Sequence, residues 1–85
     1  MTDKTDKVGI ITHFYSKIGV GIIKLLKELK KGDNINIKGH KTDFKQEVEE
    51  MQFDHKDIAS GKKGQEIGIK LNEKVREGDE VFFEK

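Results

Sequence analysis

Apolar and polar positions alternate along most of this chain, which is the period of half-buried β-strands. The first run, residues 8–15, is rich in β-branched and aromatic residues and predicts a strand. Clean alternation returns at 35–37, with Ile35 and Ile37 expected to point inward, and again at 67–71. A further apolar run lies at 81–83. The pattern predicts a protein built from short strands.

Residues 20–30 fit two structures. Ile18, Ile22 and Leu29 follow a helical stripe, whereas Val20 and Ile22 also alternate with their neighbours as in a strand. Glycines at the start of the segment argue against a helix there. The pattern alone leaves strand and helix open.

Glycine followed by aspartate marks two expected turns, Gly32-Asp33 and Gly78-Asp79, and residues 57–64 are expected to form a loop. Between them, the predicted buried positions Val48, Met51 and Phe53 do not keep a strict period of two. A change of face between Val48 and Met51 therefore predicts a bulge in that strand.

Six short strands separated by turns predict an all-β fold, a single closed six-stranded β-barrel, over residues 8–85. Residues 1–7 are mostly polar and are expected to be a frayed N-terminus. The predicted core residues are Ile10, Phe14, Ile22, Ile35, Ile37, Val48, Ile67, Ile69 and Val81.

The amino-acid composition excludes several classes of protein. The 85 residues include no cysteine, so disulfides, thiolate metal sites and cysteine nucleophiles are absent from the sequence. No apolar run approaches the roughly 20 residues of a membrane-spanning helix, and the start lacks the apolar core of a signal peptide. We expect a cytoplasmic protein with no membrane partner.

The net charge of +1 hides an asymmetry, because residues 1–41 carry a charge of +5 and residues 42–85 a charge of −4. A basic half can hold phosphate groups. A mixed-charge surface that keeps a small protein soluble explains the same numbers. Both interpretations stay open at this point.

The order of turns and strands resembles domain II of translational GTPases such as elongation factor Tu. The resemblance covers about residues 8–84 and rests on "GVGIIKLLKELKKGDNINIKG", "VEEMQFDHKDIASGKKGQEIGIKL" and "VREGDEVF". It implies a β-barrel of the translation-factor domain II type. The sequence contains no GxxxxGK[ST] loop, so a GTPase is excluded.

Two narrower likenesses exist. The segments "THFYSKIGVGIIKL" and "IKGHKTDFKQEVEEMQFDH" are similar to short translation elongation factor-like proteins. They are also similar to the barrel appended to collagenase-like peptidase-family proteins, some of which act in tRNA hydroxylation. The first likeness implies an accessory factor that contacts tRNA, rRNA or a ribonucleoprotein. The second implies a module that docks on a larger enzyme of the peptidase family.

Several lysines and aromatic residues lie in predicted turns or at strand ends, where single-strand binders place them. Lys62 and Lys63 stand between glycines that allow backbone N–H groups to approach an anion. The candidate nucleic-acid-binding residues are Lys17, Lys24, His40, Lys41, Lys62, Lys63 and Tyr15. Ordinary turn and cover positions explain the same residues.

Catalytic and metal sites are not expected. His13, His40 and His55 lack dense metal-ligand spacing, although His40 with Asp43, or His55 with its aspartate neighbours, is the arrangement a metal would need. No G-x-S-x-G elbow is present. We therefore expect no enzyme activity, no cofactor and no bound metal.

Three functions compete: a ribonucleoprotein accessory module, a protein-interaction module, and a small enzyme or metal protein. A continuous positive face would favour nucleic acid, whereas an exposed apolar patch would favour a protein partner.

Overall fold

The computed structural model describes residues 7–54 and 56–84. Over these residues the chain forms β-strands and no helix. The strands are β1 (Lys7–Tyr15), β2 (Val20–Leu25), β3 (Leu29–Lys30), β4 (Asn34–Lys38), β5 (Asp43–Glu47), β6 (Met51–Phe53), β7 (Lys56–Asp57), β8 (Ser60–Gly61), β9 (Glu66–Lys70) and β10 (Glu80–Phe83). The all-β prediction is confirmed. Lys7 opens β1, and the rest of the expected frayed N-terminus lies outside the described residues.

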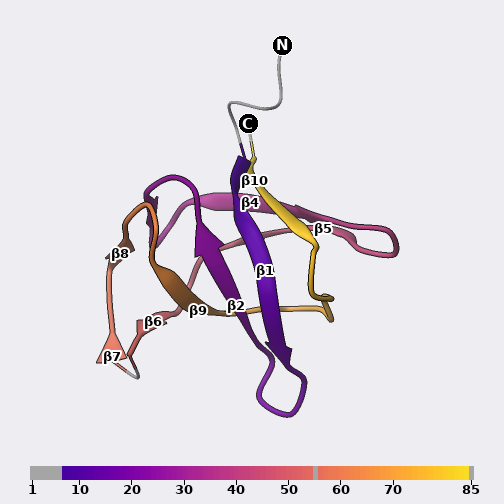
Figure 1. Cartoon of the computed structure of the whole chain (residues 1–85), viewed down its shortest axis with the longest axis horizontal. Coiled ribbons are helices and arrows are strands. Elements are labelled where there is room, and N and C mark those ends of the chain that lie inside the picture. The colour runs from indigo at the N-terminus through magenta and orange to yellow at the C-terminus, as the bar shows by residue number, and fades with distance from the viewer. Residues whose placement is uncertain (1–6, 55, 85) are drawn as a thin grey trace.

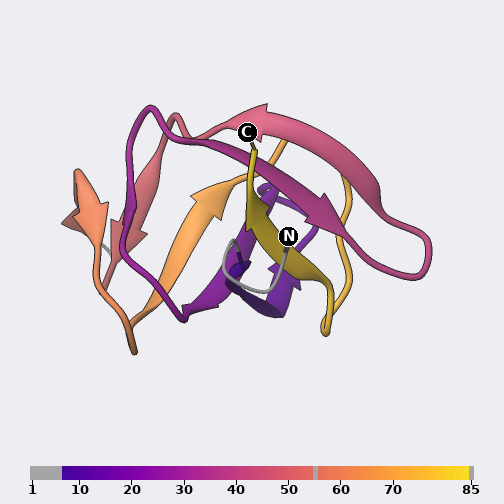
Figure 2. The same cartoon turned by 90° about the horizontal axis from the view of Figure 1, so that it is seen from above.

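Eight strands form one antiparallel sheet in the order β5-β4-β10-β1-β2-β9-β6-β7, and β3 pairs with β8 in a small second sheet. The large sheet curls, so that β4 and β5 lie across the molecule from β1 and β2 (Figures 1 and 2). The apolar side chains between these layers form one core.

The expected closed six-stranded barrel is not found, because the strand order ends at β5 and at β7. β5 and β6 follow each other along the chain but pair with opposite parts of the sheet, β5 with β4 and β6 with β9. Residues 48–50 between them form no strand. Alternation reports which strands are half-buried, but it does not report whether the outermost strands pair.

The expected irregularity after Val48 is present as this break. The Val48 N–H donates to the Asp33 carbonyl at 2.9 Å, and the Gly32 N–H donates to the Val48 carbonyl at 2.9 Å. Val48 and Met51 are both buried. Phe53 was expected to be buried as well, and this is wrong, because its side chain lies at the end of β6 and is 39% exposed.

Six of the predicted core residues are buried: Ile35, Ile37, Val48, Ile67, Ile69 and Val81. The choice of Ile10 and Ile22 is wrong, because Ile11 and Ile23 are the buried members of these pairs. The β1–β2 register shifts between Ile11 and His13, which breaks the period of two. Phe14 is partly buried and packs against the core.

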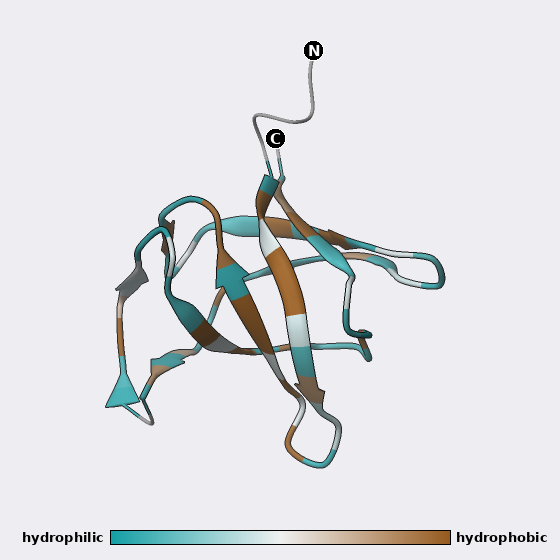
Figure 3. Ribbon diagram, in the orientation of Figure 1, coloured by the Kyte–Doolittle hydropathy of each residue, from teal (hydrophilic) through white to brown (hydrophobic). Residues whose placement is uncertain are grey.

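The open question at residues 20–30 is resolved as two strands, β2 and β3, joined by residues 26–28 outside any strand. β2 pairs along its length with both β1 and β9, so its backbone groups are satisfied on two sides. Figure 3 shows the result: apolar residues run along β1 and β2, whereas the tip of the β4–β5 hairpin is hydrophilic.

Candidate functional site

A groove of about 480 Å³ crosses the outer face of the sheet where β2, β9 and β6 lie side by side. Its floor is Gly68, which pairs with Ile22 on one side and Gln52 on the other. A Cβ placed on Gly68 would stand 3.2 Å from Val20 Cγ1 and 3.5 Å from Ile22 Cδ1. The absence of a side chain at this position therefore makes the groove deep.

One wall of the groove is apolar. Tyr15 and Ile18, at the β1–β2 hairpin, are 49% and 57% exposed, and Val20 and Ile22 of β2 continue the wall. The hairpin is held firmly, because the Gly19 N–H donates to the Tyr15 carbonyl at 2.9 Å and Lys70 Nζ donates to the Ile18 carbonyl at 3.0 Å. The exposed apolar surface is thus built on a fixed turn.

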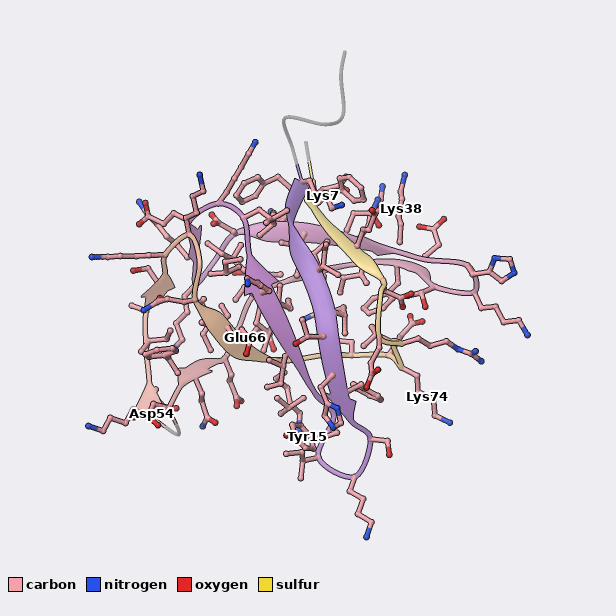
Figure 4. All side chains as sticks on the ribbon, in the orientation of Figure 1. Lys7, Tyr15, Lys38, Asp54, Glu66 and Lys74 are labelled. Carbon is pink, nitrogen blue, oxygen red and sulfur yellow. The ribbon has the colours of Figure 1, made fainter. Side chains whose placement is uncertain are left out.

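The opposite wall is polar and acidic. Asp54 and Glu66 line the groove, and both Glu50 and Lys70 line an adjoining hollow of about 220 Å³. Figure 4 shows Asp54 and Glu66 on the same side of the β1–β2 hairpin. Asp54 has a φ of 56°, in the left-handed region that few residues other than glycine, asparagine and aspartate adopt readily. The groove therefore joins an apolar wall to negative charge.

The structure spreads the predicted nucleic-acid-binding residues over several elements. Lys17 lies in the β1–β2 turn and Lys24 is exposed near the end of β2. The pairs His40–Lys41 and Lys62–Lys63 lie in the loop between β4 and β5 and the loop between β8 and β9. These loops project from different sides of the molecule (Figure 1). The two loops and the β1–β2 turn do not form one continuous face.

Tyr15 is the only predicted site residue that lines the groove, and the sequence reasoning missed its partners. Those partners are Ile18, Val20, Ile22, Gln52, Asp54, Glu66 and Gly68. A signal was present, because β1 and β2 carry apolar residues on both faces. In the structure, the outward-facing apolar residues of β2 line the groove together with Tyr15 and Ile18.

The histidines do not assemble a metal site in the described part of the chain. Nδ1 of His13 lies 3.2 Å from Oε2 of Glu77, and the His13 ring contacts the Tyr15 ring edge-on at 4.4 Å between centroids. Among residues 7–54 and 56–84, no three side chains of the metal-binding types gather. His55 lies outside the described residues, as does the arrangement considered for it. The same residues contain no helix able to span a membrane.

Comparison with known proteins gives relatives in a different class from translation factors. Over 78 residues, or 91% of its length, the chain is 45% identical to an uncharacterized protease of Methanocaldococcus jannaschii. It is 36% identical over 77 residues to a collagenase of Porphyromonas gingivalis. The chain spans only about a fifth of these relatives, 19% and 21% of their lengths. No family model matches it.

The fold is that of a solved domain. The C-terminal domain of a putative U32 peptidase from Geobacillus thermoleovorans superposes with a TM-score of 0.90 over all of this chain and 99% of that one. The selenomethionine variant of the same domain gives a TM-score of 0.87. Sequence identity is 12%, so this likeness concerns the fold.

These findings overturn the translation hypothesis. The relatives are named protease and collagenase, and the structural neighbour is a domain of a putative U32 peptidase. The expected elongation-factor-like role is therefore wrong, and the expected contact with tRNA or rRNA gains no support from these relatives. The resemblance to translation factors did not identify a binding partner, because most of the matching positions were turn glycines and core aliphatic residues. Such positions specify an architecture and not a partner.

Proposed function

We propose that this chain is a non-catalytic docking module, the counterpart of the C-terminal domain of U32 peptidase-type proteins. The observation that carries the proposal is that its sequence matches about a fifth of larger proteins named protease or collagenase. In such proteins the remaining four-fifths provides room for the catalytic residues. The domain that corresponds to this chain would bind a segment of the remaining part of such a protein.

The groove is the surface best suited to docking. Tyr15 and Ile18 expose large apolar side chains to water on a fixed hairpin, and Val20 and Ile22 extend them into one strip. Covering apolar surface yields roughly 25 cal/mol for each Å² removed from water. A contiguous apolar strip with a polar rim is typical of a protein–protein contact.

The charged residues around the groove determine which kind of segment can bind in it. Asp54 and Glu66 line the groove together with the apolar strip, and Glu50 lines the adjoining hollow, where Lys70 donates to the Ile18 carbonyl. A carboxylate that loses water on docking needs an opposite charge to compensate it. We therefore assign the groove to an extended segment of the larger protein, one with an apolar side chain next to a lysine or arginine.

A non-catalytic role has support of its own. The sequence has no cysteine nucleophile, and His13, which lies in β1 beside the hairpin, is paired with Glu77. Among the described residues, the lining of the groove contains no histidine, serine or threonine. A covalent route through a serine, threonine or cysteine would need such a side chain with a neighbouring base, and the described lining contains none of the three.

Footprinting with hydroxyl radicals tests the proposal. The chain replaces the matching segment of the M. jannaschii relative, and thermal melting followed by circular dichroism verifies that the chimera folds. We expect Tyr15 and Ile18 to be labelled several-fold more slowly in the chimera than in the 85-residue chain. Leu26, which is exposed but outside the groove, is the control and should react equally in both. Equal labelling of Tyr15 and Ile18 in the two proteins would overturn the docking proposal.

A further inference from the structure

A second hollow, of about 350 Å³, lies on the other flank of the β1–β2 hairpin from the acidic groove. Its rim carries three cationic side chains, Lys41, Lys74 and Arg76. Figure 4 places Lys74 on the opposite side of the hairpin from Asp54 and Glu66. The hollow therefore differs from the groove in both position and sign of charge.

Two turns hold the cations in place. Lys41 belongs to the β4–β5 turn, where the Gly39 N–H donates to the Thr42 carbonyl at 2.7 Å. Arg76 is the first residue of the turn before β10. The Arg76 N–H donates to Oδ2 of Asp79 at 2.9 Å, and the Asp79 N–H donates to the Arg76 carbonyl at 3.0 Å. Asp79 itself is buried. The backbone at Lys41 and Arg76 is thus held in two hydrogen-bonded turns.

Among the described residues, no carboxylate lines the hollow. Four acids lie close to it along the chain: Asp43, Glu73, Glu77 and Asp79. Asp79 accepts the Arg76 backbone N–H, and Glu77 pairs with His13 at 3.2 Å. Within residues 7–54 and 56–84, the ion pairs found involve none of the three cations. Three cationic residues therefore line one hollow, and no acid is among the described residues of its lining.

The remaining lining is suited to an organic anion. Ser16 and Thr42 bring hydroxyl groups that can donate hydrogen bonds, and Phe14 and Val75 bring apolar surface. Arginine offers a planar fork of donors that matches an oxyanion, and lysine offers a point charge. The hollow thus combines a cationic rim with an apolar part.

We propose that this hollow binds the phosphate group of a small phosphate monoester, with the organic part of the ligand against Phe14 and Val75. A phosphate monoester carries a charge of about −1.5 to −2 at neutral pH and three strong acceptor oxygens, which three cations and two hydroxyls can satisfy. A single carboxylate carries less charge and fewer acceptors. The site is independent of the docking groove.

Nuclear magnetic resonance titration of the 85-residue chain at constant ionic strength tests the site. The probes are phenyl phosphate, inorganic phosphate, benzoate and a tetraglutamate peptide. We expect phenyl phosphate to shift the amides of residues 14–16, 41–42 and 74–76. We also expect it to bind at least about tenfold more tightly than benzoate or tetraglutamate, because a phosphate group carries a charge of about −1.5 to −2 and three acceptor oxygens, whereas each carboxylate carries a single charge and two oxygens. Inorganic phosphate should shift the same cationic positions and leave Phe14 nearly unmoved.

Variants separate a built site from general charge attraction. Arg76→Gln and Lys74→Gln should each weaken phenyl phosphate binding by about tenfold. The control removes the same charge elsewhere: Lys62→Gln should leave the affinity within about twofold, since its loop lies outside the hollow. Equal losses in the control, equal binding of tetraglutamate, or no saturable shift up to about 10 mM phenyl phosphate would each overturn the proposal.

Discussion

In β1 and in β2, two adjacent isoleucines lie on opposite faces of the sheet. Ile11 and Ile23 are buried in the core, with exposures of 1% and 0%, whereas Ile10 and Ile22 lie on the outer side. Ile22 lines the groove that we propose as the docking surface. Residues that look alike in the sequence therefore have different environments, one in the core and the other at the groove.

Truncation of the two β2 isoleucines should separate these roles. Ile23→Ala removes a fully buried side chain and should lower the free energy of unfolding by about 2–5 kcal/mol. Ile22→Ala empties no enclosed space and should cost less than about 1.5 kcal/mol. Urea titrations of both variants and the wild type measure the difference. Losses of equal size would contradict the assignment of Ile23 to the core and Ile22 to the surface.

The sequence predicts burial well where one face is clearly polar. Ile35 and Ile37 alternate with asparagine and lysine, and Ile67 and Ile69 alternate with Gly68 and Lys70, so their inward orientation follows from the pattern. In β1 and β2 both faces are apolar, and period alone cannot select one. The groove was missed for the same reason, because its wall is the second apolar face.

At the scale of elements, one turn design occurs three times. The residue groups 30–33, 62–65 and 76–79 each have a glycine in third place, with φ of 92°, 90° and 94°. In each, the side chain of the fourth residue accepts the N–H of the first, at 2.9, 2.8 and 2.9 Å. A type II turn needs positive φ at its third residue, which glycine adopts without strain. The repeated design sets where several of the strands begin.

We expect the more buried acceptor side chain to contribute more to the free energy of unfolding. Asp79 is 5% exposed and its carboxylate packs against Gly39, whereas Asp33 is only partly buried. Asp79→Ala should lower the free energy of unfolding by about 1–3 kcal/mol, because it leaves the Arg76 N–H without its partner in a buried setting. Asp33→Ala should cost about 1 kcal/mol or less, since water can replace the acceptor. Thermal melts compare the two, and a larger loss for Asp33→Ala would contradict the argument.

The longer strands were predictable, whereas the short strands β3, β7 and β8 and the closure of the sheet were not. The expected loop at residues 57–64 is wrong in part, because it contains β8. The Gly-Asp turns marked the starts of β4 and β10 directly in the sequence. The partners of β5 and β6 depend on residues 48–50, where three residues leave the ladder and the chain moves from β4 to β9. That transfer is a long-range pairing, for which local pattern carries no information.

At the scale of the whole molecule, the lining residues of each hollow come from both halves of the sequence. Acidic residues line the groove on one flank of the β1–β2 hairpin, and basic residues line the hollow on the other flank. The acidic groove combines Glu66 and Asp54 from the acidic half with Tyr15 and Ile18 from the basic half. The cationic hollow combines Lys41 with Lys74 and Arg76, again from both halves. The charges of +5 and −4 along the sequence therefore did not predict a basic face, since folding interleaves the two halves.

The groove should bind peptides according to this arrangement. In fluorescence titrations, a short peptide of alternating leucine and lysine should bind more tightly than one of alternating leucine and glutamate, because Asp54 and Glu66 repel the second. Ile18→Asp should weaken the leucine–lysine peptide by about tenfold, since a charge then replaces the exposed end of the apolar wall. Leu26→Asp, at an exposed apolar site outside the groove, should change the affinity less than twofold.

A charge reversal distinguishes a selective groove from a merely sticky surface. Asp54→Lys combined with Glu66→Lys leaves Tyr15, Ile18 and the other apolar residues of the wall unchanged, so loss of apolar contact cannot explain its effect. The double variant should reverse the preference and bind the leucine–glutamate peptide more tightly, because the rim then attracts carboxylates. Its melting temperature should fall by a few degrees, because lysine adopts the φ of 56° at position 54 less readily than aspartate, whereas the exposed charge itself contributes little to stability. An unchanged preference for the lysine peptide would show that the rim does not select the occupant, and the assignment of a basic, apolar segment to the groove would fail.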